Sequence, residues 1–122
     1  MPRSSATSHE LARVELLAGL SGQTLAVLAK RMVREEVAPG TALVREGESG
    51  DRFYVVFAGM LSVTNRDMGA REILRPGDYF GEVALAMDVP RTATVAAITP
   101  AVVASCDRAT FDELLRPLFA DD

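Results

Sequence analysis

The residues best suited to chemistry lie in one segment, Phe80 to Thr92, between two predicted strands. Gly81 directly precedes an Ala- and Leu-rich stretch, Glu82 to Ala86, which is long enough for a short helix. A glycine in front of a helix lets a ligand approach backbone N–H groups that have no partner within the helix, and the helix dipole favours negative charge there. Arg91 follows Pro90, and its planar guanidinium could bind the same anion. The segment therefore predicts an anion-binding site.

Glu82 indicates which kind of anion the site could bind. A carboxylate beside an anion is repulsive unless the ligand also carries hydroxyl donors a few ångströms from its negative charge. A phosphate with a neighbouring ribose hydroxyl meets both requirements, so the pattern favours a nucleotide. The alternative is a plain ion pair between Glu82 and Arg91 that holds a loop and binds nothing. That alternative would leave Gly81 and Pro90 unexplained.

Short predicted strands separated by turns must position this segment. Seven of the nine glycines fall between residues 40 and 81, among short runs rich in Val, Phe, Tyr and Thr, which is typical of a β-sandwich or small barrel. Strands are expected at Val33–Val37, Ala42–Arg45, Phe53–Phe57, Leu61–Arg66, Glu72–Leu74, Ala93–Ala97 and Ala101–Ser105. The Phe53–Phe57 run is apolar throughout and should be buried on both faces, and Leu61–Thr64 should be half-exposed. Asn65–Gly69 has the composition of a hairpin tip.

Helical spacing of apolar residues appears at both ends of the chain. It predicts two helices between Ser8 and Arg31, the second capped by Ser21, and another from Arg108 to Phe119. The expected fold is mainly β: an antiparallel jelly roll (double-stranded β-helix) with N-terminal helices, a short helix in the chemical segment and a C-terminal helix. Residues 1–8 are expected to form a flexible N-terminus, and residues 9–122 a single domain.

Composition excludes several function classes. The chain has 122 residues, and its net charge of −4 argues against direct nucleic-acid binding. Its longest apolar stretch, Phe53 to Leu61, is too short for a membrane-spanning helix, so no membrane insertion is expected. The single cysteine, Cys106, is expected in the core and suits a cytoplasmic protein without disulfides. A cupin-like metalloenzyme is a remote alternative, because the single histidine, His9, cannot supply its clustered ligands. We expect neither a metal site nor catalysis.

The sequence resembles the cyclic nucleotide-binding domain family, the sensor modules of catabolite-activator-type regulators, cyclic-nucleotide-dependent kinases and cyclic-nucleotide-gated channels. F-G-E-V-A-L (Phe80 to Leu85), followed by P-R-T-A-T-V (Pro90 to Val95), is similar to the family's phosphate-binding cassette. E-G-E-S-G-D-R-F-Y-V-V-F-A-G (Glu46 to Gly59) resembles its glycine-bracketed hairpin, and I-L-R-P-G-D-Y-F-G (Ile73 to Gly81) resembles the entry to the cassette. The resemblance extends from Leu16 to about Phe119.

The resemblance implies roles for matching residues. Glu82 would accept a hydrogen bond from the ribose 2′-hydroxyl, Arg91 would pair with the exocyclic phosphate oxygens, and backbone N–H groups near Gly81, Ala84 and Thr92 would complete the anion cradle. The ligand-binding residues are then Gly81, Glu82, Val83, Ala84, Leu85, Arg91 and Thr92, and the wall for the base is Val63, Leu74 and Phe80. Thr92 is compatible with either purine, and cAMP is preferred to cGMP on family frequency alone.

The implied function is a non-catalytic cyclic nucleotide sensor that signals to an effector domain or partner protein, with a homodimer as one arrangement open to it. The ligand is cAMP or cGMP, and no catalytic cofactor is expected. The alternative is a degenerate domain that keeps the fold as an interaction surface with an empty pocket. Family members close the pocket with a further C-terminal helix. The sequence stops at Asp122, which suggests an excised portion of a larger regulator or a partner that closes the pocket.

Overall fold

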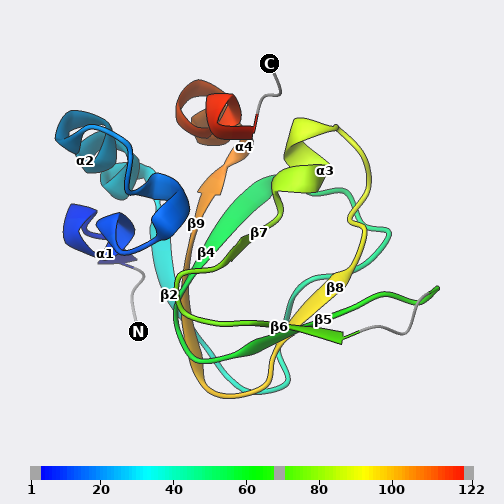
Figure 1. The fold of residues 1–122 in the computed structure, drawn as a ribbon. Coiled ribbons are helices and arrows are strands. Elements are labelled where there is room, and N and C mark those ends of the chain that lie inside the picture. Colours follow the sequence, from blue (N-terminus) through cyan, green and yellow to red (C-terminus); the bar gives the residue numbers. More distant parts are fainter. Residues whose placement is uncertain (1–3, 68–70, 120–122) are drawn as a thin grey trace.

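Two antiparallel sheets form the body of the molecule in the computed structural model, which describes residues 4–67 and 71–119 (Figure 1). One sheet has the strand order β1-β2-β9-β4-β7, and the other has the order β3-β8-β5-β6. The bounds of the first sheet are β1 (Ser4–Ser5), β2 (Val33–Val37), β9 (Ala101–Asp107), β4 (Arg52–Ala58) and β7 (Tyr79–Phe80). Those of the second are β3 (Ala42–Val44), β8 (Thr94–Ala97), β5 (Leu61–Thr64) and β6 (Arg71–Leu74). The predicted jelly roll is confirmed.

All seven predicted strands are present, each within two residues of its expected ends. The predicted hairpin tip is described only as far as Asp67, and residues 68–70 lie outside the described residues. Two short strands were not predicted, β1 and β7. Both consist of two residues, and such a short run has no alternation that the sequence could display.

The start of the chain differs from the flexible segment that was expected at residues 1–8. Ser4 and Ser5 pair with Arg34 and Val33 of β2. The Thr7 hydroxyl accepts a hydrogen bond from the Glu10 N–H at 3.1 Å, as the cap of helix α1 (Ser8–Ala12). Residues 4–8 are therefore part of the fold, because strand pairing and a helix cap satisfy their backbone groups. Residues 1–3 lie outside the described residues.

Helices cover one face of the five-stranded sheet (Figure 1). They are α1, a 3₁₀ turn at Glu15–Leu17 and α2 (Gly22–Arg31), where Ser21 caps the helix as predicted. The predicted C-terminal helix is present as three consecutive helical segments, α4 (Arg108–Thr110), a π-helical stretch (Phe111–Leu115) and a 3₁₀ turn (Arg116–Phe119). Within residues 4–67 and 71–119, no helix has the length and hydropathy needed to span a bilayer.

β4 is buried on both faces, as its apolar sequence predicts. Phe53 and Val55 face the helices, while Tyr54 and Val56 face the space between the two sheets. The Phe53 ring packs against that of Phe111, with centroids 5.6 Å apart. Burying a side chain of this size contributes about 2–3 kcal/mol. One strand thus anchors both cores and fixes the helices relative to the sandwich.

Candidate functional site

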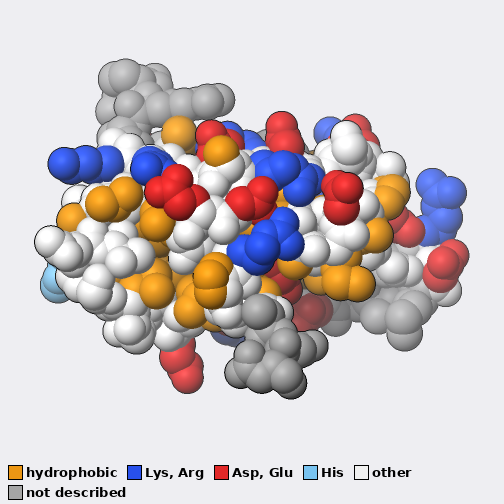
Figure 2. Space-filling model, turned by 90° about the horizontal axis from the view of Figure 1, so that it is seen from above, with side chains coloured by type: hydrophobic (Ala, Val, Ile, Leu, Met, Phe, Trp, Pro, Cys, Tyr) orange, Lys and Arg blue, Asp and Glu red, His pale blue; other side chains and the backbone are white. Residues whose placement is uncertain are grey.

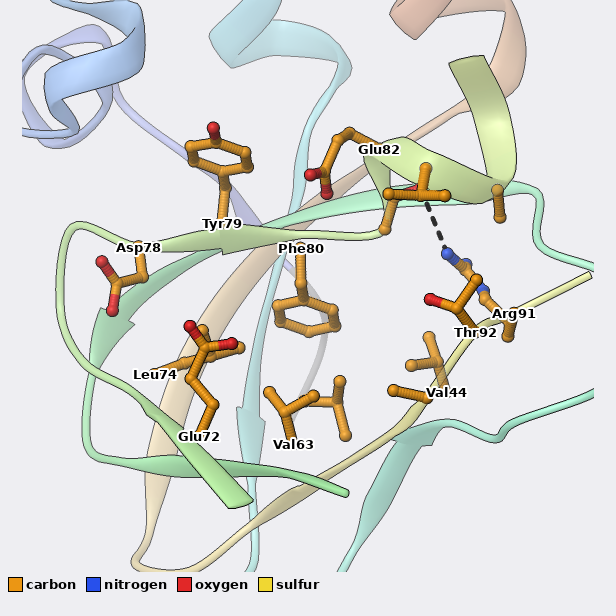
Figure 3. Close-up of a pocket in the computed structure, with 15 residues that line it drawn as sticks. Val44, Val63, Glu72, Leu74, Asp78, Tyr79, Phe80, Glu82, Arg91 and Thr92 are labelled. Atoms are coloured by element: carbon orange, nitrogen blue, oxygen red, sulfur yellow. Dashed lines mark hydrogen bonds between the residues drawn. The ribbon is translucent and has the colours of Figure 1, made fainter. Parts of the chain in front are cut away.

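A cavity of about 370 Å³ lies between α3 (Glu82–Ala86), β7 and the four-stranded sheet (Figure 3). Its volume is within the range of small-molecule sites. Nine of the ten predicted site residues line it: Val63, Leu74, Phe80, Gly81, Glu82, Val83, Ala84, Arg91 and Thr92. The tenth, Leu85, does not. Its side chain lies on the face of α3 that points away from the cavity. It is fully buried in the core beneath the helices.

A row of cross-strand neighbours forms one wall of this cavity. Val44 of β3 pairs with Val95 of β8, Val95 pairs with Val63 of β5, and Val63 pairs with Glu72 of β6. Paired residues point to the same face of a sheet, so the wall is three valines that end in one carboxylate. Opposite them is Phe80, whose ring stacks on Tyr54 with centroids 4.7 Å apart and planes 2° apart. The cavity therefore offers an apolar slot for a flat ring.

Gly81 directly precedes α3, as predicted, and its backbone conformation favours glycine. Its φ of +98° lies in the left-handed region. A Cβ atom there would lie 2.7 Å from the carbonyl oxygen of Arg52 and 2.9 Å from Nη1 of Arg91. The backbone at Gly81 thus passes close to Arg91, and α3 begins beside the cavity.

Arg91 is held by its backbone and by its side chain. Its N–H donates to the Glu48 carbonyl at 2.7 Å, and its carbonyl accepts from the Gly47 N–H at 2.9 Å. The guanidinium donates from Nη2 to the Arg52 carbonyl at 2.9 Å and from Nη1 to the Gly81 carbonyl at 3.3 Å. Only 7% of the residue is exposed. These two bonds use two of the five N–H donors of a guanidinium, and the structure shows no hydrogen bond from the other three within residues 4–67 and 71–119.

Gly50 supports the same arginine, a role that the sequence analysis did not assign. A Cβ atom at Gly50 would lie 2.5 Å from Nε and 2.6 Å from Cζ of Arg91, and 2.8 Å from Cβ of Ala84. The guanidinium therefore rests directly on this glycine. This contact could not be predicted from the neighbours of Gly50, because it joins segments that are distant in the sequence.

Burial shifts the pKa values of two charged groups at the cavity, Glu82 and Arg91. Burial raises the pKa of Glu82 above its ordinary value, and the backbone N–H groups of Glu82 and Val83 partly offset this. Burial likewise lowers the pKa of Arg91, against the opposing effects of Tyr54, Asp51 and Glu82. Ion pairs among the described residues form elsewhere, and Glu82 and Arg91 are not paired with each other. The plain ion pair that was the alternative explanation for these two residues is thus not formed.

Six further residues line the cavity that were not predicted: Val44, Glu72, Asp78, Tyr79, Ala93 and Val95. For Glu72, a signal was present. Leu74 was predicted, and in a strand the residue two positions earlier points to the same face. Val44 and Val95 had no such signal, because only the pairing of β8 with β5 and of β3 with β8 brings them to this wall.

The face that carries α3 and the C-terminal helical segments is mixed in charge. In Figure 2, which views the molecule from above Figure 1, acidic and basic side chains are interspersed with apolar ones. No group of three or more metal-ligating side chains is found among the described residues. The site combines the buried guanidinium of Arg91, the half-buried carboxylate of Glu82 and an apolar slot.

Comparison with known proteins points to one family. The family model described as "cyclic nucleotide-binding domain" matches residues 34–117. The chain is 43% identical over 109 residues to a cAMP-dependent protein kinase regulatory subunit of Yarrowia lipolytica, covering 88% of this chain and 29% of that protein. It is 36% identical over 124 residues to the cGMP-dependent protein kinase egl-4 of Caenorhabditis briggsae, covering 97% of this chain and 17% of that protein.

Comparison with solved structures gives the same family. The regulatory domain of Toxoplasma gondii PKA with cAMP superposes with a TM-score of 0.85 at 31% identity, covering 91% of this chain and 44% of that one. The chain spans less than a third of the length of the curated relatives named above. The similarity therefore concerns only a part of each of these relatives.

Proposed function

The chain belongs to the cyclic nucleotide-binding domain family, and from that premise we propose that it is a non-catalytic sensor domain that binds cAMP in preference to cGMP. The ligand occupies the cavity between α3 and the four-stranded sheet. The relatives named for cAMP and for cGMP support this ligand class. The preference for cAMP follows the higher identity to the cAMP-dependent relative.

The observation that carries this proposal is the buried guanidinium of Arg91 at the cavity. Two backbone carbonyls hold it in place, and its other N–H groups are free to bind the exocyclic oxygens of a cyclic phosphate. Glu82, the first residue of α3, accepts a hydrogen bond from the ribose 2′-hydroxyl. The base lies between Phe80 and the valine row. Leu85 is left out of the proposed side-chain contacts.

Calorimetric titration tests the proposal most directly. We expect cAMP to bind with a dissociation constant in the micromolar range or below, and 5′-AMP to bind far more weakly, because its open phosphate has a different shape and charge. cAMP at 100 times its dissociation constant should also stabilise the fold by about 2.7 kcal/mol. The absence of both heat and thermal stabilisation with cAMP and cGMP would leave the degenerate interaction domain as the better explanation.

Hydrogen bonds of two arginines connect α3, beside the cavity, to the C-terminal helical segments, and through them ligand binding would affect these segments. Arg108 donates to the carbonyls of Leu85 at 3.3 Å and Gly50 at 3.1 Å. Arg116 donates to the carbonyls of Leu85 at 3.1 Å and Ala86 at 3.2 Å. The end of α3 and the glycine beneath Arg91 are thus tied to the same segment. We therefore propose that this segment passes the signal to an effector domain or partner protein.

Glu82 should make binding pH-dependent. Burial raises its pKa above the ordinary value of 4.5. The ionised carboxylate is the form that accepts from the ribose hydroxyl, so ligand binding lowers this pKa. Affinity for cAMP should consequently fall as the pH drops through the folded-state pKa of Glu82, in a window that opens above 4.5. Titrations from pH 7 down to pH 5 would measure this fall.

The control for this prediction is Glu82→Gln, which cannot titrate. We expect it to bind cAMP more weakly at pH 7 and with a flatter pH profile. The stability of the ligand-free protein depends on pH in the opposite direction to the affinity. The reason is that an acid whose pKa is raised in the folded state binds its proton more tightly when folded than when unfolded. The contribution of Glu82 to the unfolding free energy, measured as the ligand-free wild type relative to Glu82→Gln, should therefore rise as the pH falls through the same window. Parallel affinity profiles for wild type and variant would contradict the assigned role.

A further inference from the structure

A hairpin outside the cavity contacts the segment that carries Arg91. This hairpin begins after β5 and is described as far as Asp67. The side chain of Asn65 donates a hydrogen bond from Nδ2 to the Thr92 carbonyl at 2.8 Å. Thr92 lines the cavity, directly after Arg91 (Figure 3), whereas Asn65 does not line it. Asn65 therefore touches the site through the backbone of a lining residue.

The hairpin holds the Asn65 amide in one orientation. Its Oδ1 accepts a hydrogen bond from the Asp67 N–H at 2.8 Å, which leaves the donor, Nδ2, directed at Thr92. The next residue, Arg66, donates its backbone N–H to Oε1 of Glu46 at 2.9 Å. This second bond ties the hairpin to the loop after β3. The donor is thus set in place by the hairpin and its neighbour.

Hydrogen bonds restrain both peptide groups that flank Thr92. The Arg91 carbonyl accepts from the Gly47 N–H at 2.9 Å, and the Thr92 carbonyl accepts from Asn65. Because a peptide group is planar, two restrained planes leave Thr92 little freedom in φ and ψ, and the direction of its side chain follows. In a trans peptide the N–H points opposite to the carbonyl, so the Thr92 N–H points away from Gly47.

Asn65 supplies one of these two restraints, and regular structure does not replace it. Residues 91–93 lie between α3 and β8 and belong to neither. Thr92 is exposed, so packing does not hold it. The bonds to the loop after β3 act on the N–H and the carbonyl of Arg91. Without the Asn65 donor, the peptide group after Thr92 is therefore able to turn, and the hydroxyl of Thr92 moves with it.

We propose that Asn65 is a positioning residue for ligand binding. By holding the Thr92 carbonyl, it directs the hydroxyl and the N–H of Thr92 to the phosphate that Arg91 binds. Both groups can donate hydrogen bonds, as an anion requires. This inference rests on the proposed function, which places the phosphate at Arg91. It gives a role to a hairpin residue that the sequence analysis did not connect with the site.

Calorimetric titration provides the first test. Asn65→Ala should weaken the binding of cAMP and of cGMP by a similar factor, about three- to tenfold, because the phosphate contact and not the base contact is affected. The matched control is Thr99→Val, in the turn between β8 and β9. It removes a side-chain oxygen that accepts from the Met60 N–H at 3.0 Å, and Thr99 does not line the cavity. This control should keep the wild-type affinities.

A double-mutant cycle tests whether Asn65 acts through Thr92. Thr92→Val removes the hydroxyl but keeps the carbonyl to which Asn65 donates. In the Thr92→Val background, Asn65→Ala should weaken cAMP binding by only about twofold, because one of the two positioned donors is already absent. A merely structural role would give the same factor in both backgrounds. Thermal unfolding checks that each variant is folded.

A further measurement requires no variant. Asn65 is the only asparagine of the chain, so selective isotope labelling of asparagine identifies its side-chain amide signal in NMR spectra. Saturating cAMP should shift this signal and slow the exchange of the amide protons with water. The reason is that a phosphate bound by Thr92 also holds the carbonyl to which this amide donates.

Three results would overturn the inference while the proposed function stands. They are an unchanged affinity of Asn65→Ala for cAMP, equal factors in the two backgrounds of the cycle, and an asparagine signal that saturating cAMP leaves unchanged. A loss of affinity for only one of the two nucleotides would also overturn it, because Asn65 would then act through the base. If the wild type binds neither nucleotide, the proposed function fails and this inference fails with it.

Discussion

Arg91→Ala is expected to weaken cAMP binding by at least ten- to a hundredfold. Hydrogen bonds to a charged group contribute about 1.5–3 kcal/mol, and the alanine variant loses them together with the only buried cation at the cavity among the described residues. Arg91→Lys should recover part of the loss, because it keeps the charge but not the planar fork of donors. Calorimetric titration of the three proteins with cAMP measures both effects.

The same substitution should also reduce stability modestly. The guanidinium donates to the carbonyls of Arg52 and Gly81, and both lose a partner, at a cost of about 1 kcal/mol each. The matched control is Arg75→Ala, an exposed arginine on the turn between β6 and β7, which changes the net charge equally. Equal losses of affinity in the two variants would mean that Arg91 acts only through the overall charge.

Local signals in the sequence were sufficient to predict most of the fold. Turn glycines and runs of alternating residues located seven strands, and Ser21 marked the start of α2. The bounds of α3 were predicted to the residue, because Gly81 in front of an Ala-rich stretch is a strong local signal. These features depend only on neighbouring residues, which explains why they could be predicted.

The parts of the site that were missed depend on contacts between distant segments. Gly50 supports Arg91 only because the loop before β4 folds against the end of the cassette segment. Val44 reaches the cavity only through the pairing of β3 with β8. Such pairing is set by the tertiary structure, so no periodicity within either segment could reveal it. The role of Leu85 could not be separated from that of its neighbours for the same reason.

Gly81→Ala should combine a loss of stability with a loss of affinity. A left-handed φ costs a non-glycine residue about 1–2 kcal/mol. The added Cβ would also lie 2.7 Å from the Arg52 carbonyl oxygen and 2.9 Å from Nη1 of Arg91. Relief of these contacts requires the arginine and the start of α3 to move apart. We expect the unfolding free energy to fall by about 2–4 kcal/mol and cAMP binding to weaken at least tenfold.

Gly77→Ala separates backbone strain from the contacts at the site. Gly77 has the same φ of +98°, on the turn before β7, but a Cβ atom there would meet nothing within 4 Å. This variant should therefore lose about 1–2 kcal/mol of stability and keep the wild-type affinity for cAMP. Chemical denaturation and calorimetry on both variants make the comparison. If both lose affinity to the same extent, strain alone accounts for the effect, and the close approach of Gly81 to Arg91 has no part in binding.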